Sequence, residues 1–179
     1  MSLMLLIGGA RSGKSQLAVR LALDQHAPVT FLATGEPGDP EMQARIDAHR
    51  EQRPPAWRTI EEPIELLAAI EQVPRESCLI VDCLTLWTAN ALETLGASAT
   101  EARAAEAATL AAGRDGLTIV VSNEVGLGIV PDNPVPREYR DLLGRVNTIW
   151  ADAADHAFLV MAGRALKLRP PQALMEEVK

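Results

Sequence analysis

The segment Gly8–Ser15 has the residue types and spacing of a phosphate-binding loop. It reads Gly-Gly-Ala-Arg-Ser-Gly-Lys-Ser and matches the pattern G-x-x-x-x-G-K-[ST]. In such loops, backbone N–H groups and the positive end of the following helix face phosphate oxygens. We expect Lys14 to contact the β- and γ-phosphates and the Ser15 hydroxyl to bind Mg²⁺. The residues expected to contact a nucleoside triphosphate here are Gly8, Gly9, Ala10, Arg11, Ser12, Gly13, Lys14 and Ser15.

The surroundings of this segment favour the phosphate-binding interpretation. An apolar run, residues 3–7, precedes it, and a helical apolar pattern, residues 17–22, follows it. The motif requires this order of strand, loop and helix. A glycine-rich turn with no ligand is the alternative, and the complete pattern in this context disfavours it.

Asp82 is the second candidate for phosphate chemistry. It ends the apolar run 78–81, and a carboxylate at such a strand end commonly holds Mg²⁺ beside the hydroxyl of the loop. The alternative is that Asp82 caps the helix that follows. Because Ser15 already supplies one ligand, the sequence favours Ser15 and Asp82 as the metal ligands.

One predicted helix places His49 between Arg45 and Arg53, each one turn away. Two neighbouring cations disfavour imidazolium, and a neutral imidazole nitrogen can attack phosphorus and hold a covalent intermediate. The arginines can bind phosphates. The residues expected to share one stripe of this helix are Met42, Ile46, His49 and Arg53. The alternative is a surface helix whose histidine borders the core; His26 and His156 lack this setting and are interpreted as structural.

Polar residues also end two other predicted strands. Thr34 and Gly35 precede a Gly/Pro-rich turn, which either approaches the nucleotide or is a plain turn. Residues 122–124, Ser-Asn-Glu, lead into a long apolar segment, 125–131, which indicates a lid or a site for a bulky, partly apolar substrate. On the next helix Arg145 and Asn147 either reach a site or belong to a solvated face.

These residues need a scaffold of strands that alternate with helices. Predicted strands cover 3–7, 29–34, 79–82, 117–122 and 157–161, with 57–61 extended and 165–168 closing one edge. Predicted helices cover 15–24, 40–52, 63–72, 85–95, 100–114 and 136–153. The pattern predicts an α/β protein with a mostly parallel sheet covered on both faces. Because ligands bind at the carboxyl ends of such strands, the motifs should converge there. The tail, 169–179, has no assigned role.

Composition narrows the class of protein. The chain has 179 residues and a net charge of −7 with no sustained basic run, which disfavours broad binding to nucleic acid or anionic membranes. We expect one domain, residues 1–179, with no membrane span. The phosphate loop starts too early to leave room for a signal peptide. Cys78 and Cys83 flank one strand and are interpreted as reduced core residues, so we expect a cytoplasmic protein.

Taken together, the motifs resemble the bifunctional adenosylcobinamide kinase/adenosylcobinamide-phosphate guanylyltransferase family of cobalamin nucleotide-loop assembly. The segments that carry the resemblance are 8–15, 33–34, 45–54, 57–59, 82–85, 122–131 and 144–147. The resemblance runs from about residue 3 to 168, and the 123–131 segment and the His49 helix are more specific than the phosphate loop. It implies a P-loop NTPase-type three-layer fold.

The resemblance also implies two reactions. A nucleoside triphosphate first phosphorylates the aminopropanol hydroxyl of adenosylcobinamide. GTP then donates GMP to that phosphate through a GMP–histidine intermediate, for which the matching residue is His49. Some relatives have two adjacent histidines, but here Ala48 precedes His49. Further nucleotide contacts implied by the resemblance are Ala33, Thr34, Gly35, Arg50, Glu51, Gln52, Arg53, Glu61 and Asp82.

The implied partners are adenosylcobinamide, ATP and GTP with Mg²⁺, and further copies of the chain in a homo-oligomer, with a trimer expected. Two alternatives stay open at this point. The first is a plain small-molecule kinase without a covalent step, and the second is a nucleotide-dependent switch or assembly ATPase. The choice between ATP and GTP as kinase donor also stays open.

Overall fold

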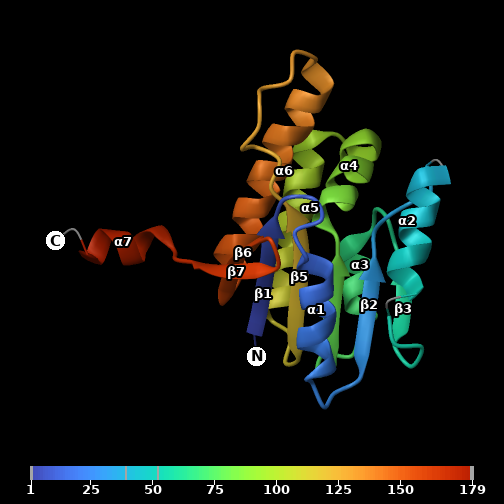
Figure 1. The fold of residues 1–179 in the computed structure, drawn as a ribbon. Helices are drawn as coiled ribbons and strands as arrows, with labels where there is room; N and C mark the ends of the chain where they lie inside the picture. Colours follow the sequence, from blue (N-terminus) through green and yellow to red (C-terminus); the bar gives the residue numbers. More distant parts are fainter. Residues whose placement is uncertain (1, 39, 52, 178–179) are drawn as a thin grey trace.

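The computed structural model describes residues 2–38, 40–51 and 53–177. These residues form one seven-stranded sheet with helices on both faces (Figure 1). The strands are β1 (Ser2–Gly8), β2 (Val29–Ala33), β3 (Arg58–Glu61), β4 (Cys78–Asp82), β5 (Leu117–Asn123), β6 (His156–Met161) and β7 (Arg164–Leu168). The helices are α1 (Lys14–Leu23), α2 (Pro40–Glu51), α3 (Leu66–Glu71), α4 (Leu84–Leu95), α5 (Ala97–Ala112), α6 (Pro134–Ala153) and α7 (Pro171–Glu177).

The order of the strands brings the predicted motifs to one edge. The order is β3-β2-β4-β5-β1-β6-β7, and every pair of neighbours is parallel except β6 and β7. Strand β5 therefore lies between β4, which ends at Asp82, and β1, which leads into the phosphate loop. In the sheet Gly8 pairs with Asn123 and Asp82 pairs with Val121. The predicted α/β fold with a mostly parallel sheet is confirmed.

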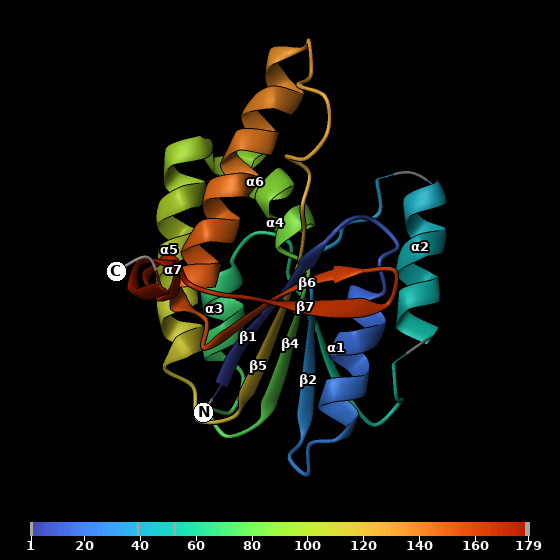
Figure 2. The same cartoon turned by 60° about the vertical axis from the view of Figure 1, so that its left-hand side comes forward.

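The core has two parts, one on each face of the sheet. Helix α1 covers one face, and α3, α4, α5 and α6 cover the other (Figure 2). Trp87 and Trp150 are fully buried on the second face, from α4 and α6. The Ala-rich helix α5 buries four alanines against them: Ala104, Ala107, Ala108 and Ala111. Its small side chains allow the helices on this face to pack closely.

Most predicted elements form, with shifted ends. Helix α3 starts at Leu66 rather than residue 63 because the Glu62 carboxylate accepts from the N–H groups of Ile64 and Glu65, both at 2.9 Å, and makes a turn there. Helix α6 starts at Pro134, where the Asn133 side chain accepts from the next-but-one N–H group. No helix in the described ranges is long and apolar enough to cross a bilayer.

The C-terminal residues form an arm that extends from the body of the molecule (Figure 1). Every residue of β7 is exposed, and α7, a helix that is not among the predicted elements, follows it. The β7–α7 arm presents exposed apolar side chains at Leu166, Leu168 and Met175, and Met161 at the end of β6 is exposed beside it. The arm therefore has an apolar surface that the rest of the described chain does not cover.

Candidate active site

The phosphate loop depends on glycine at two positions. A Cβ on Gly8 would lie 2.1 Å from the carbonyl oxygen of Val160 in the neighbouring strand β6, so no larger residue fits. Gly13 has a φ of 98°, in the left-handed region that favours glycine, and caps the start of α1. The loop therefore joins β1 to α1 with the backbone shape that the sequence motif requires.

Lys14 is held inside this loop. Its side chain is buried, and Nζ donates to the carbonyl oxygens of Gly8 and Gly9 at 2.8 and 2.7 Å. Burial lowers the pKa of Lys14, and the nearby charge of Asp82 partly opposes this shift. The ammonium group is thus fixed at the loop, where β- and γ-phosphates bind in proteins with this motif.

The Asp82 carboxylate has the burial and chemistry of a magnesium ligand, and the Ser15 hydroxyl is the second candidate ligand. The Asp82 side chain is only 9% exposed, and its Oδ2 is buried with no hydrogen-bond partner among the described residues. Leaving such an oxygen unpaired is costly, and a bound cation would satisfy it. Within the described ranges no group of three or more His, Cys, Asp or Glu residues could hold a metal. One carboxylate and one hydroxyl suit Mg²⁺, which retains water and phosphate ligands.

His49 lies beside Asp82. The His49 Nδ1 atom is 3.8 Å from Asp82 Oδ2, and the imidazole is half exposed. The sequence predicts a role for each residue but not their proximity, which arises because α2 follows β2 and β2 pairs with β4 in the sheet. A candidate nucleophile and a candidate metal ligand therefore share one site.

Arg53 differs from its predicted position. Helix α2 ends at Glu51, so the predicted stripe does not continue to Arg53; instead, the Arg53 N–H donates to the Arg50 carbonyl oxygen at 3.2 Å. The Arg53 guanidinium lies 3.8 Å from the centre of the Phe31 ring, a cation–π contact. Burial lowers its pKa, an effect that Asp82 opposes. Its Nε and Nη1 are buried without a hydrogen-bond partner in the described part of the chain, so this cation can accept an anionic ligand.

The remaining predicted residues of α2 are placed at its exposed end. Arg50 forms an ion pair with Glu61 at the end of β3, and both side chains are more than half exposed. Glu51 is also exposed. Gln52 lies outside the described residues, as does the side chain of Arg45. The Arg50–Glu61 pair is thus an exposed link between α2 and the sheet, of a kind that contributes little to stability.

The Thr34 hydroxyl holds the backbone that carries Asp82. It donates to the Cys83 carbonyl oxygen at 2.6 Å and accepts from the Cys83 N–H at 2.9 Å, and the side chain is fully buried. Ala33 pairs with Asp82 in the sheet. In this structure Thr34 therefore positions the candidate metal ligand, and its hydroxyl is already engaged.

Gly35 allows helix α2 to approach the sheet. A Cβ at this position would lie 3.0 Å from Leu86 Cδ1 and 3.7 Å from Ile46 Cδ1. A larger residue would press on the Leu86 side chain of α4, whereas its distance to Ile46 of α2 is ordinary van der Waals contact. Gly35 thus leaves room for Leu86 beside α2.

Asn147 holds the end of β5 in place. Its side chain accepts from the Ser122 hydroxyl at 2.6 Å and donates to the Asn123 carbonyl oxygen at 3.0 Å. The Asn123 N–H in turn donates to the Thr85 hydroxyl at 2.8 Å. The solvated-face alternative for Asn147 is wrong, because the residue is buried in this network; whether it reaches a ligand stays a prediction. In the sequence, Asn147 falls on the same helical face as Leu143 and Trp150, and this spacing is the signal for its burial.

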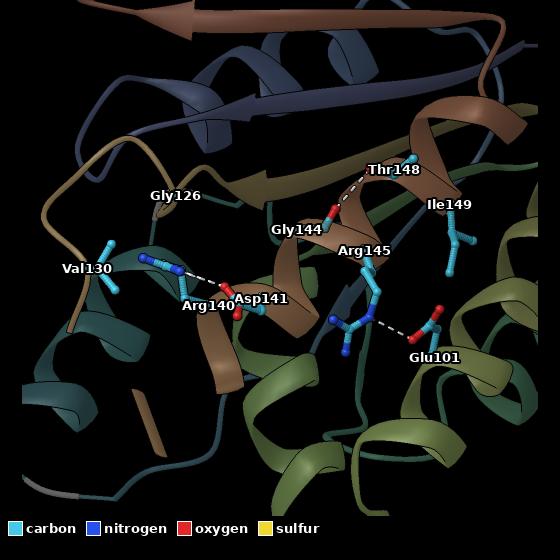
Figure 3. Close-up of a pocket in the computed structure, with 9 residues that line it drawn as sticks. All are labelled: Glu101, Gly126, Val130, Arg140, Asp141, Gly144, Arg145, Thr148 and Ile149. Carbon is cyan, nitrogen blue, oxygen red and sulfur yellow. Dashed lines mark hydrogen bonds and ion pairs between the residues drawn. The ribbon is translucent and has the colours of Figure 1, made fainter. Parts of the chain in front are cut away.

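A groove of about 700 Å³ lies between α5, α6 and the segment after β5 (Figure 3). Gly126 and Val130 line one side of it. Its two arginines are paired with carboxylates, Arg145 with Glu101 and Arg140 with Asp141, both at 2.8 Å. None of its lining residues belongs to the phosphate loop or to α2. Leu127 and Ile129, in the same segment, are 83% and 96% exposed, so the predicted lid residues are available to a ligand, and their role stays a prediction.

Comparison with known proteins identifies relatives that cover most of the chain. The family model for cobinamide kinase / cobinamide phosphate guanyltransferase matches residues 4–168. The bifunctional adenosylcobalamin biosynthesis protein CobP of Pseudomonas aeruginosa is 39% identical over 166 residues, covering 92% of this chain and 96% of the relative. The CobU proteins of Salmonella typhimurium and Escherichia coli, which carry the same description, are 37% and 36% identical, each covering 93% of this chain and 99% of the relative.

Solved structures of low sequence identity share the fold. A protein from Pyrococcus horikoshii OT3 matches with a TM-score of 0.57 at 8% identity, covering 93% of this chain and 85% of its own. A prototypical ATPase from the type III secretion system of pathogenic bacteria matches with a TM-score of 0.51 at 14% identity, covering 98% of this chain and 54% of its own. At these identities the likeness supports the architecture and not the reaction.

Proposed function

The chain belongs to the cobinamide kinase / cobinamide phosphate guanyltransferase family of enzymes, and we propose that it performs both reactions in one nucleotide-binding domain, residues 1–179. It phosphorylates the aminopropanol hydroxyl of adenosylcobinamide and then transfers GMP from GTP to the new phosphate. The observation that carries the proposal is the 3.8 Å approach of His49 Nδ1 to Asp82 Oδ2. It brings a nucleophile to the edge of the sheet that also bears the phosphate loop.

In the kinase step the protein positions the donor and neutralises its charge. The loop N–H groups and Lys14 bind the β- and γ-phosphates, and Ser15 and Asp82 would hold Mg²⁺. Bound Mg²⁺ supplies charge neutralisation between those phosphates. Lys14 Nζ already lies at the loop, and its bonds to the Gly8 and Gly9 carbonyl oxygens would be exchanged for bonds to phosphate oxygens when the nucleotide binds.

In the transfer step His49 is the acceptor of GMP. An imidazole nitrogen forms a bond to the α-phosphorus of GTP while the bond to pyrophosphate breaks. An oxygen of the corrinoid phosphate then attacks the same phosphorus and releases the histidine. Arg53 has two buried nitrogens without a hydrogen-bond partner among the described residues and lies close to Asp82. It supports this step as a cation that can bind the nucleotide phosphates.

Other residues are proposed to line the guanine nucleotide site. They are Ala33, Thr34, Gly35, Arg50, Glu51, Gln52 and Glu61. Thr34 acts here through the backbone that it holds, since its hydroxyl is engaged. The half-exposed pair of Arg50 and Glu61 has groups on both sides of the α2–β3 junction that can exchange partners with a ribose or base.

We further propose a homo-oligomer, with a trimer as the expected state and active sites near its subunit contacts. The exposed apolar side chains of the β7–α7 arm support it, since an uncovered apolar surface favours association. Light scattering coupled to size exclusion tests the state, and a monomer at micromolar concentration contradicts it. The free cysteines and the use of nucleoside triphosphates support a cytoplasmic location.

Covalent labelling tests the proposed transfer. Wild type, His49→Ala and the control His26→Ala are incubated with GTP labelled on either the α- or the γ-phosphate. We expect an acid-labile, alkali-stable adduct from the α-label alone, present in wild type and His26→Ala and lost in His49→Ala. Wild-type protein that binds GTP, phosphorylates adenosylcobinamide and takes up neither label would leave a plain kinase as the function.

A further inference from the structure

Glu124 occupies the central position at the carboxyl edge of the sheet. It directly follows β5, the strand between β4 and β1. Its N–H donates to the carbonyl oxygen of Gly8, the first residue of the phosphate loop, at 3.1 Å. The residue therefore stands between the strand that ends in Asp82 and the loop that holds Lys14.

The Glu124 side chain is fixed rather than free. The residue is half-buried, and its Oε1 accepts from the backbone N–H of Gly126. A Cβ on Gly126 would lie 2.8 Å from this oxygen, so a larger residue at that position would push the carboxylate aside. One such bond uses only part of the acceptor capacity of a carboxylate. The group is thus held in place and can still accept a proton.

The kinase step needs an acceptor for a proton. Two other carboxylates at this edge are proposed for different contacts: Asp82 lies beside His49 and would hold Mg²⁺, and Glu61 pairs with Arg50. Among the ion pairs of the described residues none involves Glu124. Glu124 is therefore a carboxylate held at this edge to which no other role has been given.

We propose that Glu124 is the general base of the phosphoryl transfer, an inference that rests on the kinase activity proposed above. The O–H bond of the acceptor hydroxyl breaks, and its proton moves to the Glu124 carboxylate. The hydroxyl oxygen bonds to the γ-phosphorus, and the bond from that phosphorus to the leaving nucleoside diphosphate breaks, with its electron pair going to the diphosphate. The carboxylic acid then returns its proton to water.

The guanylyl transfer makes no such demand. Its first acceptor is an imidazole nitrogen, and its second is an oxygen of a phosphate that is already ionised at neutral pH. Neither attack requires Glu124 to remove a proton. The inference therefore predicts a residue that serves one of the two reactions.

Glu124→Gln tests this directly. The glutamine Oε1 can still accept from Gly126, so the turn is kept, but the amide cannot take up the proton. We expect the kinase kcat to fall about 10²–10⁴-fold, with the KM for the nucleotide unchanged. Transfer of GMP to separately prepared adenosylcobinamide phosphate should proceed at the wild-type rate.

Glu62→Gln is the matched control. Glu62 makes the same kind of turn, accepting from the N–H groups of Ile64 and Glu65, beyond the edge strand β3. Both activities should survive this change. A Glu124→Gln enzyme with wild-type kinase kcat overturns the inference, as does an equal loss of both activities, which would indicate a structural role. Wild-type protein without kinase activity would instead refute the proposed function itself.

Discussion

The two halves of the candidate site are anchored in different ways. The phosphate loop continues from β1, a strand with neighbours on both sides, and Lys14 at its end is buried. The histidine lies on α2, outside the sheet. Of the α2 side chains that the structure describes, only Ile46 is partly buried, and the rest are exposed. One half is therefore part of the core, and the other rests on its surface.

This difference suggests how one nucleotide site serves two reactions. The groups that neutralise phosphate charge are fixed before the nucleotide binds, which favours phosphoryl transfer. Helix α2 is held by few contacts, chiefly His49 with Asp82, Arg50 with Glu61, and its packing over Gly35. Elements with few buried contacts open at low free-energy cost. We infer that α2 moves toward GTP for the guanylyl transfer and otherwise leaves the kinase site undisturbed.

Loss of a core side chain should have the largest effect on stability. Trp87 is fully buried, and its Nε1 donates to the Ile64 carbonyl oxygen at 2.8 Å. Trp87→Ala should lower the free energy of unfolding by about 3–5 kcal/mol. Ile46→Ala, on α2, should lower it by about 1 kcal/mol or less. Urea denaturation measures both, and equal losses would mean that α2 belongs to the core.

Lys14→Ala should damage both reactions, because both use the phosphate loop. The expected loss in kcat is about 10²–10³-fold, the usual effect of removing one group that stabilises transition-state charge. Arg20→Ala removes an exposed cation from the same helix and serves as the control. Steady-state rates of the two reactions measure the effect. Guanylyl transfer at the wild-type rate in Lys14→Ala would show that this reaction does not use the phosphate loop.

Gly35→Ala should impair mainly the guanylyl transfer. The new Cβ would lie 3.0 Å from Leu86 Cδ1 of α4 and 3.7 Å from Ile46 Cδ1 of α2, so the Leu86 side chain must shift beside α2. We expect a loss of about tenfold or less, equivalent to about 1 kcal/mol. The kinase rate should change little. Gly38→Ala is the matched control, since its Cβ would meet nothing within 4 Å. A larger loss of kinase activity than of transfer would contradict the anchoring of α2 described here.

The smallest effect is expected for the exposed ion pair. Glu61→Gln breaks the contact with Arg50 and should leave the denaturation midpoint unchanged, because such pairs contribute little. The KM for GTP in guanylyl transfer should rise by about fivefold or less. Glu106→Gln, which breaks the exposed pair with Arg103 on α5, controls for loss of a surface charge. A clear loss of stability would show that this pair, rather than packing, anchors α2.

The sequence predicted the central strands well for a physical reason. Strands buried on both faces read as continuous apolar runs, and β1, β2, β4, β5 and β6 all do so. The β7–α7 arm was harder to predict. Strand β7 is exposed along its length and α7 is short, so neither has the apolar periodicity that burial on one face produces. The start of α3 depended on a side-chain turn at Glu62 that apolar periodicity does not report.

In the site, residue types were predictable and contacts were not. The loop motif and the strand-ending Asp82 carry their chemistry in local sequence. The approach of His49 to Asp82 depends on β2 lying next to β4 and on α2 packing over Gly35, which are tertiary facts. Arg53 was assigned to the helical stripe because the helical spacing of residues continues past the end of α2. In the structure Arg53 lies outside the helix and packs on the Phe31 ring. The burial of the Thr34 hydroxyl likewise follows from strand pairing.

The most direct test of this account measures both reactions in His49→Ala beside His26→Ala, whose altered residue is exposed and lies before β2. Phosphorylation of adenosylcobinamide and transfer of GMP to its phosphate are followed separately. The account predicts that His49→Ala retains the kinase rate within about twofold, since a surface substitution has small effects elsewhere, and has no detectable guanylyl transfer, while His26→Ala retains both. Guanylyl transfer that persists in His49→Ala, or loss of both reactions together, would contradict the division of labour between the phosphate loop and α2.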